Sequence, residues 1–338
     1  MTKILLAWQD APKSIDRIRA ALPQDAELVT PSRSGEYGPY GIDPRELLRL
    51  CHDVEIIMGW QISREAIMNA PRLRMISSPH AGMDLFDIKL LREKGIMLCN
   101  ARGVNAIPVA EHTLALMLAL AKRIPTHDAS VKRTDWVEWS PTTASASLSG
   151  KTLALLGTGQ IGSEVAKRAK GFDMRVIGMR RRVGNKGIAD EVRPITALHD
   201  TLKEADFIVL ALPLTEETRG LIGRPEFSVM KPSAFLINIA RGRIVEESSL
   251  HWALTENRIA GFAADVWWDY ADAVPAGYHY NVPSRNNINK LPNVVGTPNV
   301  AANVHGMRDQ MIDLGVQNIS SYLKGEVPVR MVNLDRGY

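Results

Sequence analysis

Short apolar runs alternate with amphipathic stretches along most of this chain. In its first third, apolar runs at residues 4–8, 56–59 and 75–78 are separated by polar, helix-like stretches such as residues 44–51 and 64–69. This alternation is typical of buried parallel strands that are connected by helices. The pattern therefore predicts an α/β domain built on a parallel sheet.

The alternation stops after residue 100 and starts again near residue 150. Residues 105–123 are apolar-rich and predict a long helix, whereas residues 124–149 have weak periodicity and are interpreted as an arm or connector. A Pro-, Asn- and Gly-rich loop is expected at residues 270–292, before a last helix at about residues 303–323. Between residues 150 and 300, strands are predicted at 152–156, 175–178, 207–210, 234–239, 261–266 and 294–296, and helices at 161–171, 198–204, 225–230 and 247–256.

The second strand–helix series lies inside the first, since the helix at 105–123 leaves the first domain and the last helix returns to it. We therefore expect residues 1–102 and 299–338 to form one domain and residues 103–298 to form the other. A length of 338 residues agrees with two domains of about 150 residues each.

Composition and charge exclude several classes of protein. The net charge is only +4 and the basic residues are dispersed, so no broad basic face for nucleic acid is expected. The longest apolar run, residues 114–121, is shorter than the roughly 20 residues that span a membrane. Cys51 and Cys99 form neither a disulfide framework nor a metal-ligand pattern, so we predict no metal site. Without a signal-peptide pattern at the N-terminus, a cytoplasmic location is expected.

A glycine motif follows the strand at 152–156 directly. Gly157, Gly159 and Gly162 form G-x-G-x-x-G between a predicted strand and a predicted helix, which is the context that a dinucleotide fold requires. The first glycine permits a tight turn, the second lets the backbone approach a pyrophosphate, and the third lets helix and strand pack closely. The free N–H groups of the helix N-terminus, including those near Gln160 and Ile161, would bind the phosphates.

The end of the next strand bears on the choice of cofactor. An acidic residue about 20 positions after the motif would bind the ribose 2′-hydroxyl of NAD. This strand instead ends in Arg180, Arg181 and Arg182, and guanidinium groups pair with a 2′-phosphate. We therefore predict NADP(H), with NAD as the alternative; the arginines could instead form only a solvated surface turn.

Over essentially its whole length the sequence resembles the D-2-hydroxyacid dehydrogenase family, which includes formate dehydrogenases. The similarity lies in an ordered set of motifs: residues 103–112, the glycine loop, residues 212–218, 237–242, 264–266 and 291–295. The resemblance implies a doubly wound Rossmann cofactor domain inserted into a flavodoxin-like substrate domain, with a cleft between them. It also implies a homodimer, for which the helix and arm at residues 105–149 are the expected contact.

The resemblance also assigns roles to individual residues. Arg241 matches the Arg that binds the substrate carboxylate and polarises the neighbouring carbonyl, which suits its planar fork of donors. Asp265 matches an Asp that orients the nicotinamide, and Ala81, Gly82 and Met83 belong to a loop whose backbone N–H groups bind the carboxylate. The implied cofactor contacts are Gly157, Gly159, Gln160, Ile161, Gly162, Arg180, Arg181, Leu212, Pro213, Thr218, Ala240 and Asp265.

The sequence departs from the family at the proton donor. The family has a His after Pro at the last cofactor-domain strand, and a Glu that tunes it; these positions hold Asn299 and Tyr270. An amide cannot supply a proton near neutral pH. His80, in the substrate loop, is the first candidate for an alternative donor, and Tyr270 is a second, poorer one because a phenol ordinarily titrates near pH 10. His305 is a weaker candidate, because it is expected to lie on the returning helix. His112 falls in a helical pattern and is interpreted as structural.

Three interpretations remain open. Another group, such as His80, supplies the proton for keto-acid reduction. Alternatively, the reaction needs little proton transfer and Asn299 donates only a hydrogen bond, as the similarity of residues 265–267 to formate dehydrogenases would allow. In the third, the chain binds a dinucleotide as a sensor or scaffold, like the family's transcriptional corepressors. The presence of both Arg241 and the glycine loop favours an enzyme that acts on a small carboxylate substrate.

Overall fold

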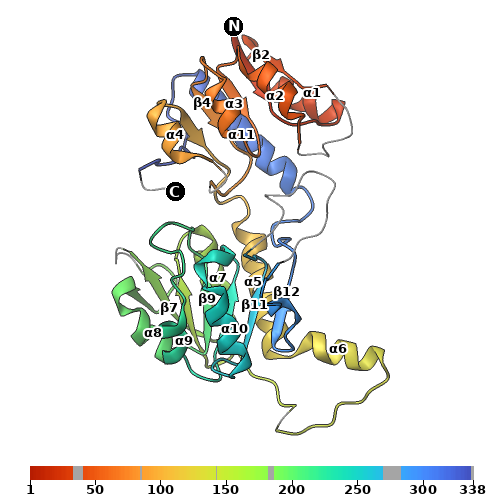
Figure 1. The fold of residues 1–338 in the computed structure, drawn as a ribbon, viewed down its shortest axis with the longest axis vertical. Helices are drawn as coiled ribbons and strands as arrows, with labels where there is room; N and C mark the ends of the chain where they lie inside the picture. The colour runs from red at the N-terminus through yellow and green to blue at the C-terminus, as the bar shows by residue number, and fades with distance from the viewer. Residues whose placement is uncertain (33–40, 84–85, 142, 182–185, 269–282, 336–338) are drawn as a thin grey trace. The chain divides into compact units, whose positions relative to one another are not determined.

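The computed structural model describes residues 1–32, 41–83, 86–141, 143–181, 186–268 and 283–335. The chain divides into two compact units (Figure 1). In the described residues, the smaller unit comprises 1–104 and 305–335, and the larger unit comprises 105–268 and 283–304. The following paragraphs describe each unit separately.

The smaller unit is built on a parallel five-stranded sheet with the order β2-β1-β3-β4-β5, which is the flavodoxin-like order. Its strands are β1 (Thr2–Leu6), β2 (Ala26–Val29), β3 (Ile56–Met58), β4 (Met75–Ser77) and β5 (Met97–Cys99). Its helices are α1 (Pro12–Ala21), α2 (Pro44–Cys51), α3 (Arg64–Met68), α4 (Ile88–Glu93) and α11 (Met307–Leu323).

Both faces of this sheet are buried. One core contains Leu5 and Ile57 and is covered by α2, α3 and α4. The other contains Ile4 and Ile56, with α1 and α11 packed over it. The C-terminal helix α11 returns to this sheet, where Ser77 Oγ donates a hydrogen bond to the carbonyl of Gly315 at 2.8 Å. Alternate residues of each strand therefore serve different cores, as strand geometry requires.

The larger unit has a parallel seven-stranded sheet with the order β12-β11-β10-β9-β6-β7-β8. Counted from β6, the six strands β6 to β11 have the Rossmann order, and β12 extends it. Its strands are β6 (Thr152–Leu156), β7 (Arg175–Arg180), β8 (Glu191–Pro194), β9 (Phe207–Leu210), β10 (Phe235–Asn238), β11 (Gly261–Ala264) and β12 (Val294–Gly296).

Helices cover both faces of the larger sheet. The helices α5 (Ala106–Ala121) and α7 (Gln160–Lys170) pack over one core, which takes Leu153 and Leu155 from β6. The helices α8 (Leu198–Glu204), α9 (Arg224–Val229) and α10 (Glu247–Thr255) pack over the other, which takes Ala154 and Leu156. The remaining elements are α6 (Ile124–Lys132) and the short 3-10 turns η1 (Ile195–Ala197), η2 (Gly242–Ile244) and η3 (Ile288–Lys290).

The predicted fold class is confirmed: both units are doubly wound parallel α/β structures. The analysis of periodicity missed α1, α4, α6, β2, β5 and β8, because these elements are short or weakly apolar. For example, β8 has the sequence Glu-Val-Arg-Pro at a sheet edge, and α6 begins directly after Arg123 in a left-handed conformation. The last helix begins at Met307 and not near residue 303, because Gly306 precedes it with a φ of 76°.

Two further observations bear on the expectations from composition. In the described parts of the chain, no helix has the length and apolar character needed to cross a membrane. Cys51 and Cys99 are both buried free thiols in the smaller unit, and burial raises the pKa of Cys99 to about 12. A thiol with so high a pKa stays protonated and unreactive at neutral pH.

Candidate functional site

The predicted site residues of the larger unit lie along one edge of its sheet. The strand register aligns Leu156 with Leu210, and Asn238 with Ala264 and then Gly296. Because all seven strands are parallel, the segments that follow these residues leave the sheet at the same carboxyl edge. Ligands of open α/β sheets bind outside this edge.

The glycine loop has the geometry that its motif predicts. Gly157 has a φ of 98°, and a Cβ on it would collide with the backbone of Ala211, which follows the neighbouring strand β9. A Cβ on Gly162 would collide with the carbonyl of Gly157, whereas a Cβ on Gly159 would meet no atom within 4 Å. The loop leads into the N-terminus of α7 at Gln160. Its backbone therefore leaves open space at the position where a pyrophosphate would approach.

The end of β7 carries basic side chains beside this loop. Arg180 donates from Nε to Thr158 Oγ1, inside the glycine motif, at 2.7 Å. Arg181 forms an ion pair with Glu217 at 2.6 Å, and Glu217 lies in the loop after β9. Arg182 lies outside the described residues. Two guanidinium groups thus bond residues of the glycine loop and of the loop after β9, which border the expected position of the adenosine ribose.

Arg241 follows the end of β10 in extended backbone, with a φ of −147°. The buried Asn238 holds this segment, because its side chain donates to the carbonyl of Arg241 at 2.9 Å and accepts from the N–H of Ala240 at 3.1 Å. Next to it, Gly242 packs so closely on the backbone of Trp267 that a Cβ would collide there. These contacts position the guanidinium-bearing residue at the carboxyl edge next to β11.

Asp265 follows β11, and its carboxylate binds the turn that follows β12. The residue is 3% exposed, and its carboxylate accepts hydrogen bonds from Thr297 Oγ1 at 2.6 Å and from the N–H groups of Val300 and Ala301 at 2.9 Å each. Asn299 lies at the exposed part of this turn with a left-handed φ of 58°, which Asn tolerates better than most residues. The contacts of Asp265 in this structure are therefore with the turn that carries Asn299.

The predicted substrate loop lies in the smaller unit, after β4. The N–H of Gly82 donates to Nδ1 of His80 at 3.1 Å, and the N–H of His80 donates to Ser78 Oγ at 3.1 Å. Nδ1 is thus an acceptor, which places the ring proton on Nε2. Asn100 holds the loop through the carbonyl of Ala81 at 2.9 Å, and Met83 is buried. Two of the loop's N–H groups are therefore already used within the loop.

The remaining predicted residues divide into described and undescribed positions. Thr218 donates to the carbonyl of Pro213 at 2.7 Å and so closes the loop after β9 that contains Leu212. Ala240 is buried, and its carbonyl accepts a hydrogen bond from Arg241 Nη1 at 2.7 Å. Tyr270, the second candidate proton donor, lies outside the described residues. The positions that match the family's cofactor motifs thus lie at or after the ends of five strands, β6, β7, β9, β10 and β11, along one sheet edge.

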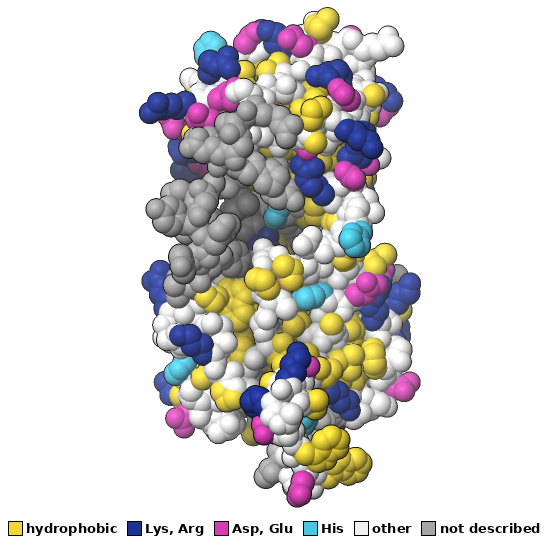
Figure 2. Space-filling view, turned by 90° about the vertical axis from the view of Figure 1, so that its right-hand side faces the viewer, with side chains coloured by type: hydrophobic (Ala, Val, Ile, Leu, Met, Phe, Trp, Pro, Cys, Tyr) yellow, Lys and Arg dark blue, Asp and Glu magenta, His cyan; other side chains and the backbone are white. Residues whose placement is uncertain are grey.

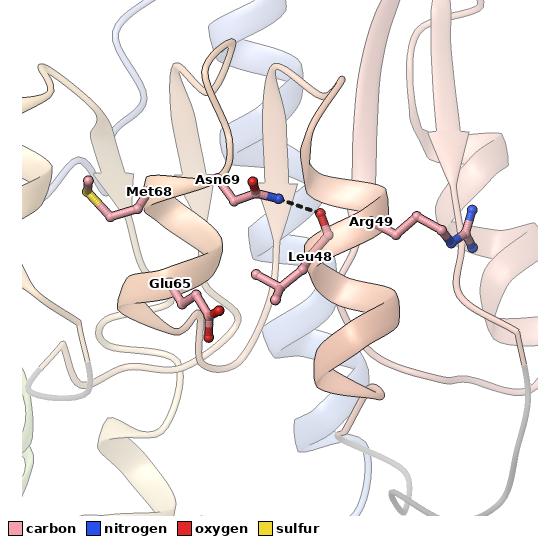
Figure 3. Close-up of a pocket in the computed structure, with 5 residues that line it drawn as sticks. All are labelled: Leu48, Arg49, Glu65, Met68 and Asn69. Carbon is pink, nitrogen blue, oxygen red and sulfur yellow. Dashed lines mark hydrogen bonds between the residues drawn. The ribbon is translucent and has the colours of Figure 1, made fainter.

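The smaller unit has a shallow hollow on its surface. It lies between α2 and α3 and is lined by Leu48, Arg49, Glu65, Met68 and Asn69 (Figure 3). Asn69 bridges the two helices by donating to the carbonyl of Leu48 at 2.7 Å. None of the predicted site residues lines this hollow. Within the described chain, no group of three or more His, Cys, Asp or Glu residues could hold a metal ion.

The structure adds residues that the sequence analysis did not select. Thr158 and Thr297 each bond a predicted site residue, and each is adjacent in sequence to a motif residue, which is the only signal that could have identified them. His112, interpreted from its helical pattern as structural, bonds Thr297 at 2.9 Å. Thr158 bonds Arg180 and Thr297 bonds His112, so the three side chains belong to two separate contacts at the carboxyl edge of the sheet.

Comparisons with known proteins agree with this geometry. The family model described as "D-isomer specific 2-hydroxyacid dehydrogenase, NAD binding domain" matches residues 114–301. The chain belongs to this family. A glyoxylate reductase of Pyrococcus furiosus is 35% identical over 302 residues, which cover 86% of each chain. The predictions of the family and of an NAD(P)-dependent dehydrogenase are thereby confirmed.

Two other relatives differ in length or in the described ligand. A D-3-phosphoglycerate dehydrogenase of Methanocaldococcus jannaschii is 34% identical over 299 residues, which are 87% of this chain but only 54% of that relative. This chain thus spans about half the length of that protein. The solved structure of an acyclic imino acid reductase in complex with NADPH and D-Arg has a TM-score of 0.79 and 27% identity, and covers 98% of this chain and 100% of the other.

The different surroundings of two motif glycines lead to a testable contrast. We expect Gly162→Ala to destabilise the larger unit by about 1–3 kcal/mol, because its Cβ must displace backbone. Gly159→Ala should leave the melting temperature nearly unchanged and yet weaken NAD(P)H binding at least about tenfold, because its Cβ occupies the space for the pyrophosphate. Differential scanning fluorimetry and fluorescence titration measure the two effects; equal dinucleotide affinity in Gly159→Ala and wild type would contradict the assignment.

Proposed function

We propose that the protein is an oxidoreductase that transfers a hydride between NADP(H) and a small carboxylate substrate of the 2-hydroxy/2-keto acid type. The observation that supports this most directly is the position of Arg241 on the same sheet edge as the glycine loop. The similarity to a glyoxylate reductase favours a small 2-keto acid as substrate. A bound nicotinamide would supply or accept the hydride.

Arg241 is the residue that we assign to the substrate anion. Its guanidinium has five donors in a planar fork and can bind a carboxylate and the adjacent carbonyl oxygen together. The backbone that carries it is held by Asn238 and by the close packing of Gly242, so little ordering remains when the substrate binds. Ala81, Gly82 and Met83 of the loop after β4 are assigned to carboxylate binding through their backbone N–H groups, of which that of Gly82 donates to His80 Nδ1 in this structure.

The proton donor is proposed to be atypical. Reduction of a keto group adds a hydride to carbon and a proton to oxygen, and Asn299 can donate a hydrogen bond but no proton. We assign the proton to His80 in its imidazolium form, in which both ring nitrogens carry a hydrogen. The ring gives one proton to the developing alkoxide and returns to the neutral form, in which Nδ1 accepts from the N–H of Gly82. Tyr270 is retained as the alternative donor.

We also propose NADP(H) as the cofactor. Arg180 is held beside the glycine loop by Thr158, and Arg181 is balanced by Glu217, a carboxylate with which a 2′-phosphate would compete. The NADPH complex of the imino acid reductase shows that a protein with this fold accepts NADPH. NAD remains the alternative that binding measurements decide.

A homodimer is proposed from the surface of the arm. The segment after α6 extends from the larger unit (Figure 1), and its Trp136 and Trp139 side chains are 89% and 102% exposed. Ile124 and Val131 of α6 are also exposed. Figure 2 shows the face on which the arm lies, with hydrophobic side chains gathered at its lower end. Two exposed Trp side chains on one arm are typical of a surface that a second copy covers.

The cytoplasm is the proposed location, because two buried free thiols fit a reducing compartment. No nucleic-acid or membrane partner is proposed.

Turnover with small acids tests the proposed function. Among 2-keto acids, 2-hydroxy acids and formate, we expect NADPH-dependent reduction of a small 2-keto acid such as glyoxylate. Arg241→Ala should lower kcat/KM by roughly ten- to hundredfold, which corresponds to the loss of a charged hydrogen bond. Arg243 lies two residues after Arg241 and is exposed. Arg243→Ala is therefore the matched control, and it should change kcat/KM little.

The same screen distinguishes the other functions. Turnover of formate with a rate independent of pH would favour a reaction without a proton donor. Tight NADPH binding with no turnover of any acid would contradict the proposed function and favour a dinucleotide sensor or scaffold.

Cofactor preference can be tested at one end of β7. The wild-type protein should bind NADPH more tightly than NADH, and Arg180→Asp should reverse this preference because a carboxylate repels the 2′-phosphate and can bind the ribose hydroxyl. Arg175→Asp makes the same charge change at the opposite end of β7 and should preserve the preference. Fluorescence titration measures the dissociation constants of NADPH and NADH for the wild type and for each variant. Equal affinities of the wild type for the two cofactors would show that these arginines do not bind the phosphate.

The pH dependence of turnover tests the proton donor. If His80 supplies the proton, kcat should show one limb between about pH 5 and 8, where histidines change charge, and His80→Ala should abolish that limb. His52→Ala, an exposed histidine of the same unit, should leave the profile unchanged. If the wild type reduces keto acids strongly and neither His80→Ala nor Tyr270→Phe lowers that activity, both candidate donors are excluded. If Asn299→His raises keto-acid reduction sharply, the site is that of an ordinary dehydrogenase from which the acid residue is missing.

A further inference from the structure

A chain of three side chains connects α5 with the turn that carries Asn299. His112, on α5, lies with Nε2 at 2.9 Å from Thr297 Oγ1. Thr297 Oγ1 donates to Asp265 Oδ1 at 2.6 Å, and the direct distance from His112 Nε2 to that oxygen is 3.7 Å. A helix, the end of β11 and the end of β12 each contribute one of these side chains.

The direction of each hydrogen bond follows from the number of hydrogens. A hydroxyl has a single hydrogen, and that of Thr297 is donated to the Asp265 carboxylate. Thr297 Oγ1 must therefore accept from His112, which requires a hydrogen on Nε2 of the imidazole. The chain is oriented from His112 through Thr297 to Asp265, and its acceptor end is a carboxylate that is almost fully buried. Hydrogen bonds of this kind to a buried charge are stronger than neutral ones.

The same carboxylate determines the conformation of the turn. Besides Thr297, it accepts from the N–H groups of Val300 and Ala301, so that it closes the turn around Asn299 from both sides. Trp267 adds a bond from Nε1 to the carbonyl of Thr297 at 2.9 Å. Asn299 is left-handed, a conformation that persists where its surroundings over-determine it. A change at Thr297 is therefore transmitted to the backbone that presents Asn299.

We propose that His112 is a positioning residue of the active site. It donates to Thr297, keeps that hydroxyl directed at Asp265, and so holds the turn that presents the Asn299 amide. This proposal rests on the proposed function, because that function gives Asn299 its place beside the substrate. His112 is not assigned a proton-transfer step, and its role depends on its Nε2–H donor and not on the bulk of the imidazole ring.

Paired variants separate the hydrogen bond from simple packing. His112→Leu removes the donor, whereas His112→Gln keeps a side-chain N–H at a comparable distance from the backbone. Thr297→Val removes the hydroxyl with little change of shape, and Thr297→Ser keeps it. His251→Leu, on α10 of the same unit, is the control for loss of a helical histidine.

Two measurements are made on each full-length variant: hydrogen exchange of the 297–301 segment, and kcat and KM for glyoxylate with saturating NADPH. We expect His112→Leu and Thr297→Val to exchange faster at the Val300 and Ala301 amides and to lose kcat by about tenfold or more, since small displacements of a positioned group reduce the rate strongly. NADPH affinity should change by less than about twofold. His112→Gln and Thr297→Ser should resemble wild type in both measurements.

The outcomes distinguish this proposal from the proposed function. If His112→Leu and Thr297→Val match His251→Leu in exchange and in kcat, the positioning role is refuted while the function stands. If His112→Gln loses as much kcat and exchanges as fast as His112→Leu, the imidazole ring acts through packing and not through its hydrogen bond to Thr297, which also refutes the proposal. If the wild type turns over no acid, the proposed function fails, and the exchange measurement alone decides whether His112 holds the turn. Should His112→Leu not fold, the near-isosteric Thr297→Val tests the same bond.

Discussion

Parallel pairing of the strands in the larger sheet is the constraint on which its candidate site depends. In a parallel sheet every strand ends at the same edge, so the register that aligns Asn238, Ala264 and Gly296 also aligns the residues that follow them. Arg241, Asp265 and Asn299 thus come to one edge although up to 58 positions of sequence separate them. A slip of one residue in any pair would direct these side chains to the opposite face of the sheet.

Backbone contacts at glycines make that edge compact. Gly157 touches the backbone that follows β9, and Gly162 touches Gly157 itself, so the helix α7 begins immediately above the sheet. At the other side, Gly242 packs on the backbone of Trp267. Each contact excludes even a methyl group, which is why the glycines serve a packing purpose as well as a conformational one. Gly159 differs from these glycines, because a Cβ on it would meet no atom within 4 Å.

A buried carboxylate connects the cofactor edge with the turn after β12. Asp265 has its hydrogen-bonding capacity used by one hydroxyl and two backbone amides of that turn. Burying a carboxylate is costly unless it is well hydrogen-bonded, so the turn and Asp265 require one another. These hydrogen bonds hold the turn that carries Asn299. The turn therefore fixes the position of an amide that can donate a hydrogen bond but cannot act as an acid.

The sequence by itself determined the fold class, the position of most strands along the chain and the family, because apolar periodicity and short motifs are local signals. It also predicted Arg241, Asp265 and Asn299 as site residues, since each lies within or just after a family motif at a predicted strand end, and the structure places all three after strands that end at one edge. Weakly apolar elements such as β8 escaped detection, because pairing at the sheet edge and not their own pattern makes them strands.

Only the tertiary structure decided which side chains meet. A histidine in an apolar-rich helix has the same local pattern whether it is buried in a core or bonded to a distant hydroxyl, so periodicity could not connect His112 with Thr297, 185 positions away. Likewise, the pairing of Arg180 with Thr158 and of Arg181 with Glu217 depends on which strands are neighbours in the sheet. Local sequence determines the conformation of each segment, but contacts between segments form only where the assembled sheet brings their ends together, because burial of apolar surface is a property of the whole domain.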